Sequence, residues 1–204
     1  MKIKTISLAK NFAAVMMMLV GLTFASCDDN NEPDDKFTGE AMYGDYTGIM
    51  TSQVVTLEEG ETAGVEITAS VDNDTVTFSS FPIHDIVMSI VGDEEAANAI
   101  VEAVGDVKYE IGYKSTVVAS SKSINMQLDP KPLVLNVVLS PESEPLTVTV
   151  EVSAAKDAAY TLLDSKMNFA ITVDKVWLGN GDDKTELPGF QPLTLSFDMT
   201  QSKK

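Results

Sequence analysis

The sequence predicts a mainly β protein: an antiparallel meander of about eight or nine strands, closed as a barrel or stacked as a sandwich, with two helices inserted at about residues 83–104. Apolar and polar residues alternate along most of the chain after residue 43, turn-forming residues separate the alternating runs, and one segment changes to helical spacing. Alternation with a period of two buries one face of a strand and leaves the other in water, which is typical of antiparallel sheets.

The predicted strands follow one another with short connections. The alternating runs are 65–71, 76–78, 107–113, 124–128, 146–152, 169–173 and 193–199, and the run 133–139 is apolar on nearly both faces. Polar turn residues between the runs predict hairpins at 72–74, 141–145 and 180–183. From this alternation we expect the side chains of Ile111, Val150, Phe169 and Phe197 to be buried in the core.

The segment at 83–104 breaks this period of two. Its apolar residues recur at intervals of three and four, first over 83–91 and again over 97–104, which predicts two short amphipathic helices. Gly92 and Gly105 are placed to end these helices in a left-handed conformation. We expect the helical pair to cover an open end or edge of the sheet, and the alternative is a mobile lid over a ligand.

Residues 1–26 predict a lipoprotein signal peptide. Lysines precede a short apolar stretch at 12–22, and small residues stand just before Cys27, the only cysteine of the chain. The stretch is too short and wrongly flanked for a membrane-spanning helix. The site resembles a lipobox in which Phe24 replaces the usual leucine. We therefore expect Cys27 to carry fatty acids such as palmitate and to anchor the chain to a membrane; the alternative is an ordinary thiol.

The rest of the chain divides into a tether at 27–40 and a single β-rich domain at 41–204. The tether is acidic and has almost nothing apolar to bury, so we expect it to be flexible. Its acids directly after Cys27 resemble the export signal that sends lipoproteins of Bacteroidota to the cell surface. The predicted location is therefore the outer membrane of the cell envelope, facing outward; the alternative for the tether is a plain solubilising linker.

The charge of the chain excludes some partners. The sequence has 31 acidic and 14 basic residues, a net charge of −17, and no arginine. Binding to nucleic acid needs a basic patch, so we expect no nucleic-acid partner. The acidic turns at 72–74 and 180–183 lack the ligand spacing of a calcium-binding loop. We expect no metal and no cofactor, and interpret the acids as a solvated exterior.

The search for catalytic residues yields none. His84 is the only histidine, and no nucleophile with a local signature accompanies it, so we expect it to be a surface or partly packed residue. The many acids leave open a carboxylate pair of the kind used in glycoside hydrolysis. Tyr46 and Trp177 are weak candidates for ligand contact, although packing is the favoured role of both. Thr75 lies in Asp-Thr-Val, which resembles an O-glycosylation site of exported Bacteroidota proteins.

Several short motifs resemble those of a known family. They are Gly-Asp-Tyr-Thr-Gly at 44–48, Phe-Ser-Ser-Phe-Pro-Ile at 78–83 and Leu-Asp-Pro-Lys-Pro-Leu at 128–133. They are similar to a domain of unknown function in lipoproteins of gut Bacteroidota, over roughly residues 41–200. The opening strands also resemble the calycin-like barrels of the same bacteria. The resemblance implies a calycin-like β-barrel and assigns no catalytic residue.

Three functions remain open from the sequence. The first is a non-enzymatic binding or accessory module that presents its surface to a glycan, a peptide or a small apolar ligand. The second is a small envelope hydrolase that uses carboxylates, which two convergent acids in a deep pocket would favour. The third is a structural or adhesin-like subunit, which an unpaired strand edge would favour.

Overall fold

The computed structural model describes residues 37–54, 64–138, 144–155, 157–181 and 183–202. These residues belong to one compact unit, Lys36–Lys204. The predicted signal peptide, Cys27, most of the tether and residues 141–143 of a predicted turn lie outside the described residues. Phe37 to Glu40, which the sequence assigns to the tether, are described, and Phe37 packs against the core.

Two consecutive helices interrupt a series of strands, as the sequence predicts. In chain order they are η1 (Gly39–Met42), β1 (Gly44–Val54), β2 (Val65–Asp72), β3 (Thr75–Phe78), α1 (His84–Val91), α2 (Glu94–Val104), β4 (Tyr109–Val118), η2 (Ala119–Ser121), β5 (Ser123–Pro130), β6 (Leu133–Val137), β7 (Leu146–Ala154), β8 (Ala158–Thr161), β9 (Lys166–Leu178), β10 (Thr185–Glu186) and β11 (Leu193–Gln201). The prediction of a mainly β chain with two helices at about 83–104 is confirmed.

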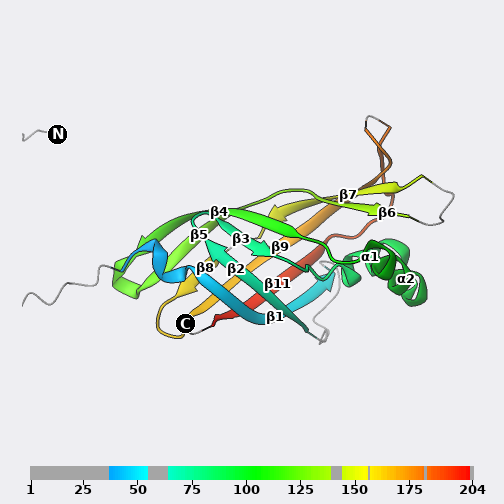
Figure 1. The fold of residues 1–204 in the computed structure, drawn as a ribbon. Helices are drawn as coiled ribbons and strands as arrows, with labels where there is room; N and C mark the ends of the chain where they lie inside the picture. Colours follow the sequence, from blue (N-terminus) through cyan, green and yellow to red (C-terminus); the bar gives the residue numbers. More distant parts are fainter. Residues whose placement is uncertain (1–36, 55–63, 139–143, 156, 182, 203–204) are drawn as a thin grey trace, which may run out of the picture. The chain divides into compact units, whose positions relative to one another are not determined.

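Eight of the strands form a closed antiparallel barrel (Figure 1). The ring runs β1–β2–β3–β4–β5–β8–β9–β11, and it closes because β11 pairs with both β9 and β1. The choice between barrel and sandwich is thus settled in favour of the barrel, which fits a calycin-like fold. Closure removes the edges that an open sheet would leave unpaired.

Beyond the ring, one side of the sheet continues as a short extension. β7 and β8 lie one after the other along the same edge of β9, β8 against Lys166 to Asn168 and β7 against Ile171 to Leu178. β6 pairs with β7, and α2 contacts β6. The buried side chains of Leu133, Leu135 and Val137 on β6 therefore belong to a flap that the helical pair helps to cover.

Side chains fill the interior of the barrel. Ile111, Phe169 and Phe197 on strands of the ring and Val150 on β7 of the extension are all at most 4% exposed, as the alternation predicts. The rings of Phe169 and Phe197 are stacked with centroids 4.4 Å apart, and Phe197 also contacts Phe78. An eight-stranded barrel has an interior just wide enough for such packing. The buried rings therefore occupy interior space that other eight-stranded barrels use to hold a small ligand.

Different elements cover the two ends of the barrel. At one end η1 inserts the fully buried Met42, whose carbonyl oxygen accepts a hydrogen bond from the Tyr46 hydroxyl at 2.6 Å. α1 and α2 lie toward the other end, as Figure 1 shows. Gly92 ends α1 at φ 67° in the left-handed region, as expected. Gly105 ends α2 at φ 69° but with ψ −151°, outside the left-handed helical region, so the expectation is wrong for this glycine. Asp93 caps α2 by accepting from the Ala96 backbone N–H at 2.8 Å.

Candidate functional site

Two grooves lie on the outer face of β9, β11, β1 and β2. One groove of about 450 Å³ is lined from Ile49 and Thr51 on β1, across β11, to Asn168 and Ala170 on β9. A second, of about 600 Å³, lies on the other side of Ile49 and reaches Thr68 on β2. Both grooves are lined by Ile49, so they adjoin on either side of this residue and together cross four strands.

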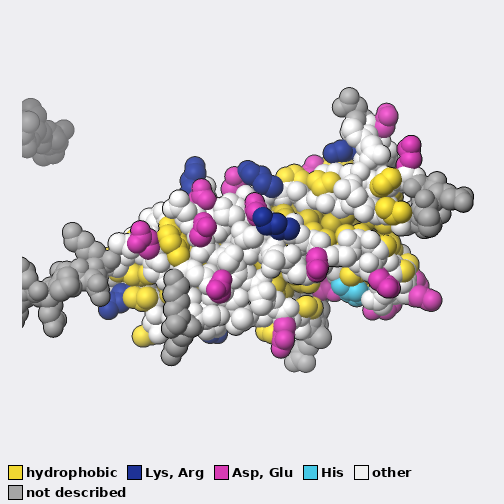
Figure 2. Space-filling view, viewed as in Figure 1, with side chains coloured by type: hydrophobic (Ala, Val, Ile, Leu, Met, Phe, Trp, Pro, Cys, Tyr) yellow, Lys and Arg dark blue, Asp and Glu magenta, His cyan; other side chains and the backbone are white. Residues whose placement is uncertain are grey.

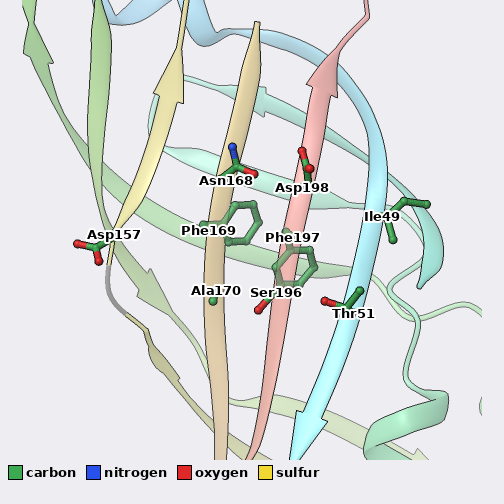
Figure 3. Close-up of a pocket in the computed structure, with 9 residues that line it drawn as sticks. All are labelled: Ile49, Thr51, Asp157, Asn168, Phe169, Ala170, Ser196, Phe197 and Asp198. Atoms are coloured by element: carbon green, nitrogen blue, oxygen red, sulfur yellow. The ribbon is translucent and has the colours of Figure 1, made fainter. Parts of the chain in front are cut away.

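Strand register arranges the side chains of the two grooves in three rows. Thr68, Thr47 and Thr200 stand opposite one another in the first row. The second row is Glu66, Ile49, Asp198 and Asn168, and the third is Thr51, Ser196 and Ala170. Figure 3 shows the last two rows from β1 to β9, without Glu66, with Asn168 beside Asp198 and with Ala170, Ser196 and Thr51 one level away. We call these three rows the hydroxyl belt.

The centre of the hydroxyl belt is apolar and its surroundings are polar. Ile49 is 40% exposed, which is a large fraction for an isoleucine on a strand. The hydroxyls of the outer rows can donate and accept hydrogen bonds, whereas Glu66 and Asp198 can only accept when ionised. The Asp198 carboxylate is also 3.2 Å from the Lys166 ammonium group. The belt therefore offers hydrogen-bonding groups around one apolar contact.

The acids near the belt do not converge. Glu66 and Asp198 lie on β2 and β11, with β1 between them, so their backbones are about 10 Å apart at the usual strand spacing. They also project from the convex outside of a barrel, which spreads side chains apart. Asp157 lines the groove with φ 65°, an uncommon conformation for a residue other than glycine, and its carboxylate points away from the labelled side chains in Figure 3.

Trp177 lies on the outer face of the extension and not in the barrel core. Alternation with a period of two predicts that Trp177 faces inward, like Phe169 and Val173. However, the pairing register with β7 shifts between Glu151 and Val152, and Val176 is buried in place of Trp177. The Trp177 indole N–H donates to Glu151 at 2.8 Å. The Lys175 ammonium is 5.8 Å from the ring centroid. The half-buried ring is therefore already contacted by its neighbours.

The other predicted contact residue, Tyr46, is a core residue. Its side chain is 1% exposed, and its ring makes an edge contact with Tyr160 at 6.5 Å between centroids. Burial, together with the nearby Tyr160 and Tyr113, raises the pKa of Tyr46 well above its usual range, so the hydroxyl stays neutral. Tyr46 shapes the barrel from inside and offers no surface to a ligand outside it.

His84 stands in a chain of polar contacts with a residue that the sequence did not suggest. The Ser52 hydroxyl donates to Asp85 at 2.6 Å, and the other carboxylate oxygen of Asp85 is 3.3 Å from the His84 ring. The far ring nitrogen of His84 is 3.3 Å from Glu94. Asp85 thus separates the serine from the histidine, whereas a catalytic triad needs the histidine next to the serine. The contact links β1 to α1.

The remaining predicted sites are less informative. Thr75 is half-buried at the start of β3, and its hydroxyl donates to Asp74 at 3.0 Å. Within the described ranges, no cluster of three or more histidine, cysteine or acidic side chains is placed to hold a metal ion. None of the helices in the described part of the chain is long and apolar enough to cross a membrane.

The sequence missed the residues of the hydroxyl belt. Their only signal is the polar half of the alternation, in which Thr47, Thr68 and Thr200 look like any outward-facing threonine of a strand. They become neighbours through the pairing of β1 with β2 and with β11, whose residues are far apart in the chain.

Comparisons with known proteins give one result. No curated protein and no solved structure matches the chain. A family match covers β1 to β9 and both helices but ends before β11, the strand that closes the barrel. Residues 41–178, more than half of the chain, match the family described as Domain of unknown function (DUF4840), and the chain therefore belongs to this family.

Proposed function

We propose that this protein is an exported, lipid-anchored protein of the outer membrane whose barrel is a non-enzymatic module that binds neutral glycan chains. The observation that carries the binding role is the hydroxyl belt, an extended polar strip on the outside of a barrel whose inside is packed. Membership of a family of unknown function is compatible with this role. The proposed lipid anchor is supported by the sequence around Cys27.

The chemistry of the belt fits a glycan better than the other ligand classes left open. Sugar hydroxyls both donate and accept, and so do Thr47, Thr51 and Ser196, while the exposed face of Ile49 can pack against the apolar face of a sugar ring. A small apolar ligand would need an apolar cavity, whereas the grooves of the belt open on the outer face and the stacked rings of Phe169 and Phe197 occupy part of the interior. The net charge of −17 disfavours anionic polysaccharides, so the glycan should be neutral.

A bulky side chain placed in the belt tests this role. Ser196→Phe fills the groove between Thr51 and Ala170, and a strand accepts phenylalanine well. The matched control is Thr116→Phe, an exposed position on β4, which lies opposite β11 in the ring. In titrations of neutral oligosaccharides followed by NMR, we expect Ser196→Phe to weaken binding at least about tenfold, or about 1.4 kcal/mol, and the control to bind normally. Equal binding by both variants, or binding only to peptides, would contradict the proposal.

The lipid anchor has a separate test. Cys27→Ala removes the thiol that acylation needs, so the variant should leave the membrane fraction and enter the aqueous phase in detergent partitioning. A variant that stays as membrane-bound as the unchanged protein would show that Cys27 is not the anchor.

A hydrolase is the alternative that the acids of the belt suggest. Glu66 and Asp198 flank Ile49 on strands that β1 separates, and they project from a convex outer face, so they do not face each other across a cleft as the two carboxyl groups of a glycosidase do. Oligosaccharides that bind should therefore remain uncut over days. If cleavage occurs and Asp198→Asn abolishes it without loss of binding, the hydrolase replaces the binding module.

An assembly role is favoured by one observation, the free edge of β6. Among the described residues β6 pairs with β7 alone and ends the sheet. The strand carries no charge, and Val134 is 52% exposed. Such an edge can pair with another strand. Light scattering decides between the roles: a glycan module should be monomeric, whereas oligomers that Val134→Lys converts to monomers would favour assembly.

A further inference from the structure

The end of the barrel that η1 covers also carries apolar side chains exposed to solvent. We call it the η1 end: η1 itself, the β4–β5 turn at 118–122 and the β8–β9 turn at 162–165. Leu163 is 94% exposed, and Val117 beside the first turn is 39% exposed. Figure 2 shows hydrophobic side chains at this end, on the side away from α1 and α2.

Hydrogen bonds hold the two turns together and to η1. The backbone N–H of Leu162 donates to the carbonyl oxygen of Lys122 at 3.0 Å, which joins the turns. The Gln201 N–H donates to Ser165 at 2.8 Å, and the Gln201 side chain donates to Tyr43 at 2.8 Å. Leu163 is therefore exposed on a turn that hydrogen bonds hold in place, and not on a free chain end.

The charge of the β4–β5 and β8–β9 turns differs from that of the chain as a whole. Lys122 in one turn and Asp164 in the other balance, although the chain has a net charge of −17. The acidic turn at 72–74 lies beside η1, because the Tyr43 hydroxyl donates to the carbonyl oxygen of Asn73 at 3.4 Å. It is distant only from the tip of the β4–β5 turn: Thr75 pairs with Gly112, and β4 continues to Val118, about 20 Å further at 3.3–3.4 Å per residue. The nearest exposed acid of η1 is Glu40.

We propose that the η1 end rests on the lipid bilayer and places Leu163 and Val117 in its interfacial region. The inference rests on the proposed anchor at Cys27. The chain from Cys27 to Phe37 can span at most about 35 Å, so an acylated Cys27 keeps this end near the bilayer. The two turns carry one charge of each sign, Lys122 and Asp164, so they can approach the interface with no net charge. The grooves and the helical end then face away from the membrane or along it.

The test uses the full-length lipidated protein in phosphatidylcholine vesicles. Acylation consumes the only native cysteine, so Leu163→Cys supplies a single free thiol for an environment-sensitive fluorophore. We expect a blue-shifted emission on vesicles and quenching by lipids brominated in their acyl chains. Val134→Cys is the matched control, because this position is 52% exposed on β6, beside α2, and its label should remain in water.

Three other outcomes would each overturn the inference, and each identifies a different step that fails. If the protein floats with vesicles but the Leu163 label is as solvated as the Val134 label, the anchor stands and the bilayer contact is wrong. If the protein does not float and the mass of Cys27 is unmodified, the anchor itself fails, and the contact fails with it. A blue shift in detergent-free buffer without vesicles would assign the η1 end to contact between copies.

Discussion

Gly48 occupies the point where the barrel closes most tightly. It faces Met199 across the β1–β11 pair, and a Cβ at this position would collide with the carbonyl oxygen of Asp198. A strand glycine of this kind permits a close backbone approach that no other residue allows. The identity of this single residue therefore determines how β1 bends toward the closing strand.

We expect Gly48→Ala to lower the free energy of unfolding by about 1–3 kcal/mol, because β1 and β11 must separate to admit the methyl group. Gly112→Ala is the matched control: its Cβ would lie 3.4 Å from the Asp129 carbonyl oxygen, an ordinary contact. Urea unfolding of both variants gives the comparison. Equal stability of the two would show that the β1–β11 approach is looser than described.

Truncation of Phe169 to alanine, another single-residue change, tests whether the interior is packed. The Phe169 ring stacks on Phe197 at 4.4 Å, and the residue is 4% exposed. Phe169→Ala should reduce the free energy of unfolding by about 3–5 kcal/mol, because the removed ring leaves a cavity that the barrel cannot collapse. Leu163→Ala, at an exposed position, should change stability little in buffer. Thermal unfolding of the two variants provides the measurement, and a tolerated Phe169→Ala would contradict the filled interior.

At the scale of elements, one contact fixes the helical pair to the barrel. Ser52 near the end of β1 donates to Asp85 in the first turn of α1, and the serine is only 9% exposed. Such a bond to a carboxylate holds α1 against the strand. We infer that the helical pair is a fixed cover over this end of the sheet and not a mobile lid.

Ser52→Ala should therefore loosen α1 more than the barrel. We expect a loss of about 1 kcal/mol of stability, a modest value because Asp85 remains partly exposed to water. Hydrogen exchange should accelerate in α1 and not in β9. Ser89→Ala is the control, since the Ser89 hydroxyl bonds only within α1, to Ile86. Unchanged exchange in Ser52→Ala would leave the helices held by apolar packing alone.

For the whole molecule, buried tyrosines predict the response to alkaline pH. Burial raises the pKa of Tyr46, Tyr109 and Tyr113 well above the usual value of about 10. For a group whose pKa is raised on folding, the stability it contributes is present below the unfolded pKa and lost as the pH rises above it. The free energy of unfolding should therefore fall above about pH 10.

Denaturant unfolding between pH 8 and pH 12 measures this loss, with tyrosinate absorbance as the second signal. Tyr109→Phe should lessen the alkaline decline by up to about 1.4 kcal/mol per pH unit. It should also cost some stability at neutral pH, since the Tyr109 hydroxyl donates to Lys131 at 2.7 Å. Titration of all tyrosines near pH 10 in the folded protein would contradict the burial of these hydroxyls.

The sequence by itself determined the elements and the inward face of most strands. Ile111, Val150 and Phe169 are buried as predicted, and α1 and α2 end just before Gly92 and Gly105, as expected. These features depend on local spacing: a period of two or of 3.6 already decides which side chains share a face. Turn-forming residues and helix-capping residues also predicted where the connections between these elements lie.

Only the tertiary structure decided closure, register and therefore the candidate site. Whether a meander closes depends on β11 meeting β1, which no local pattern records. The shift between Glu151 and Val152 turned Trp177 outward, although its parity in the sequence was inward. The row of Thr68, Thr47 and Thr200 exists because two strand pairings set its register. Strand pairing joins residues that are distant in the chain, so its outcome depends on packing of the whole barrel and not on any segment alone.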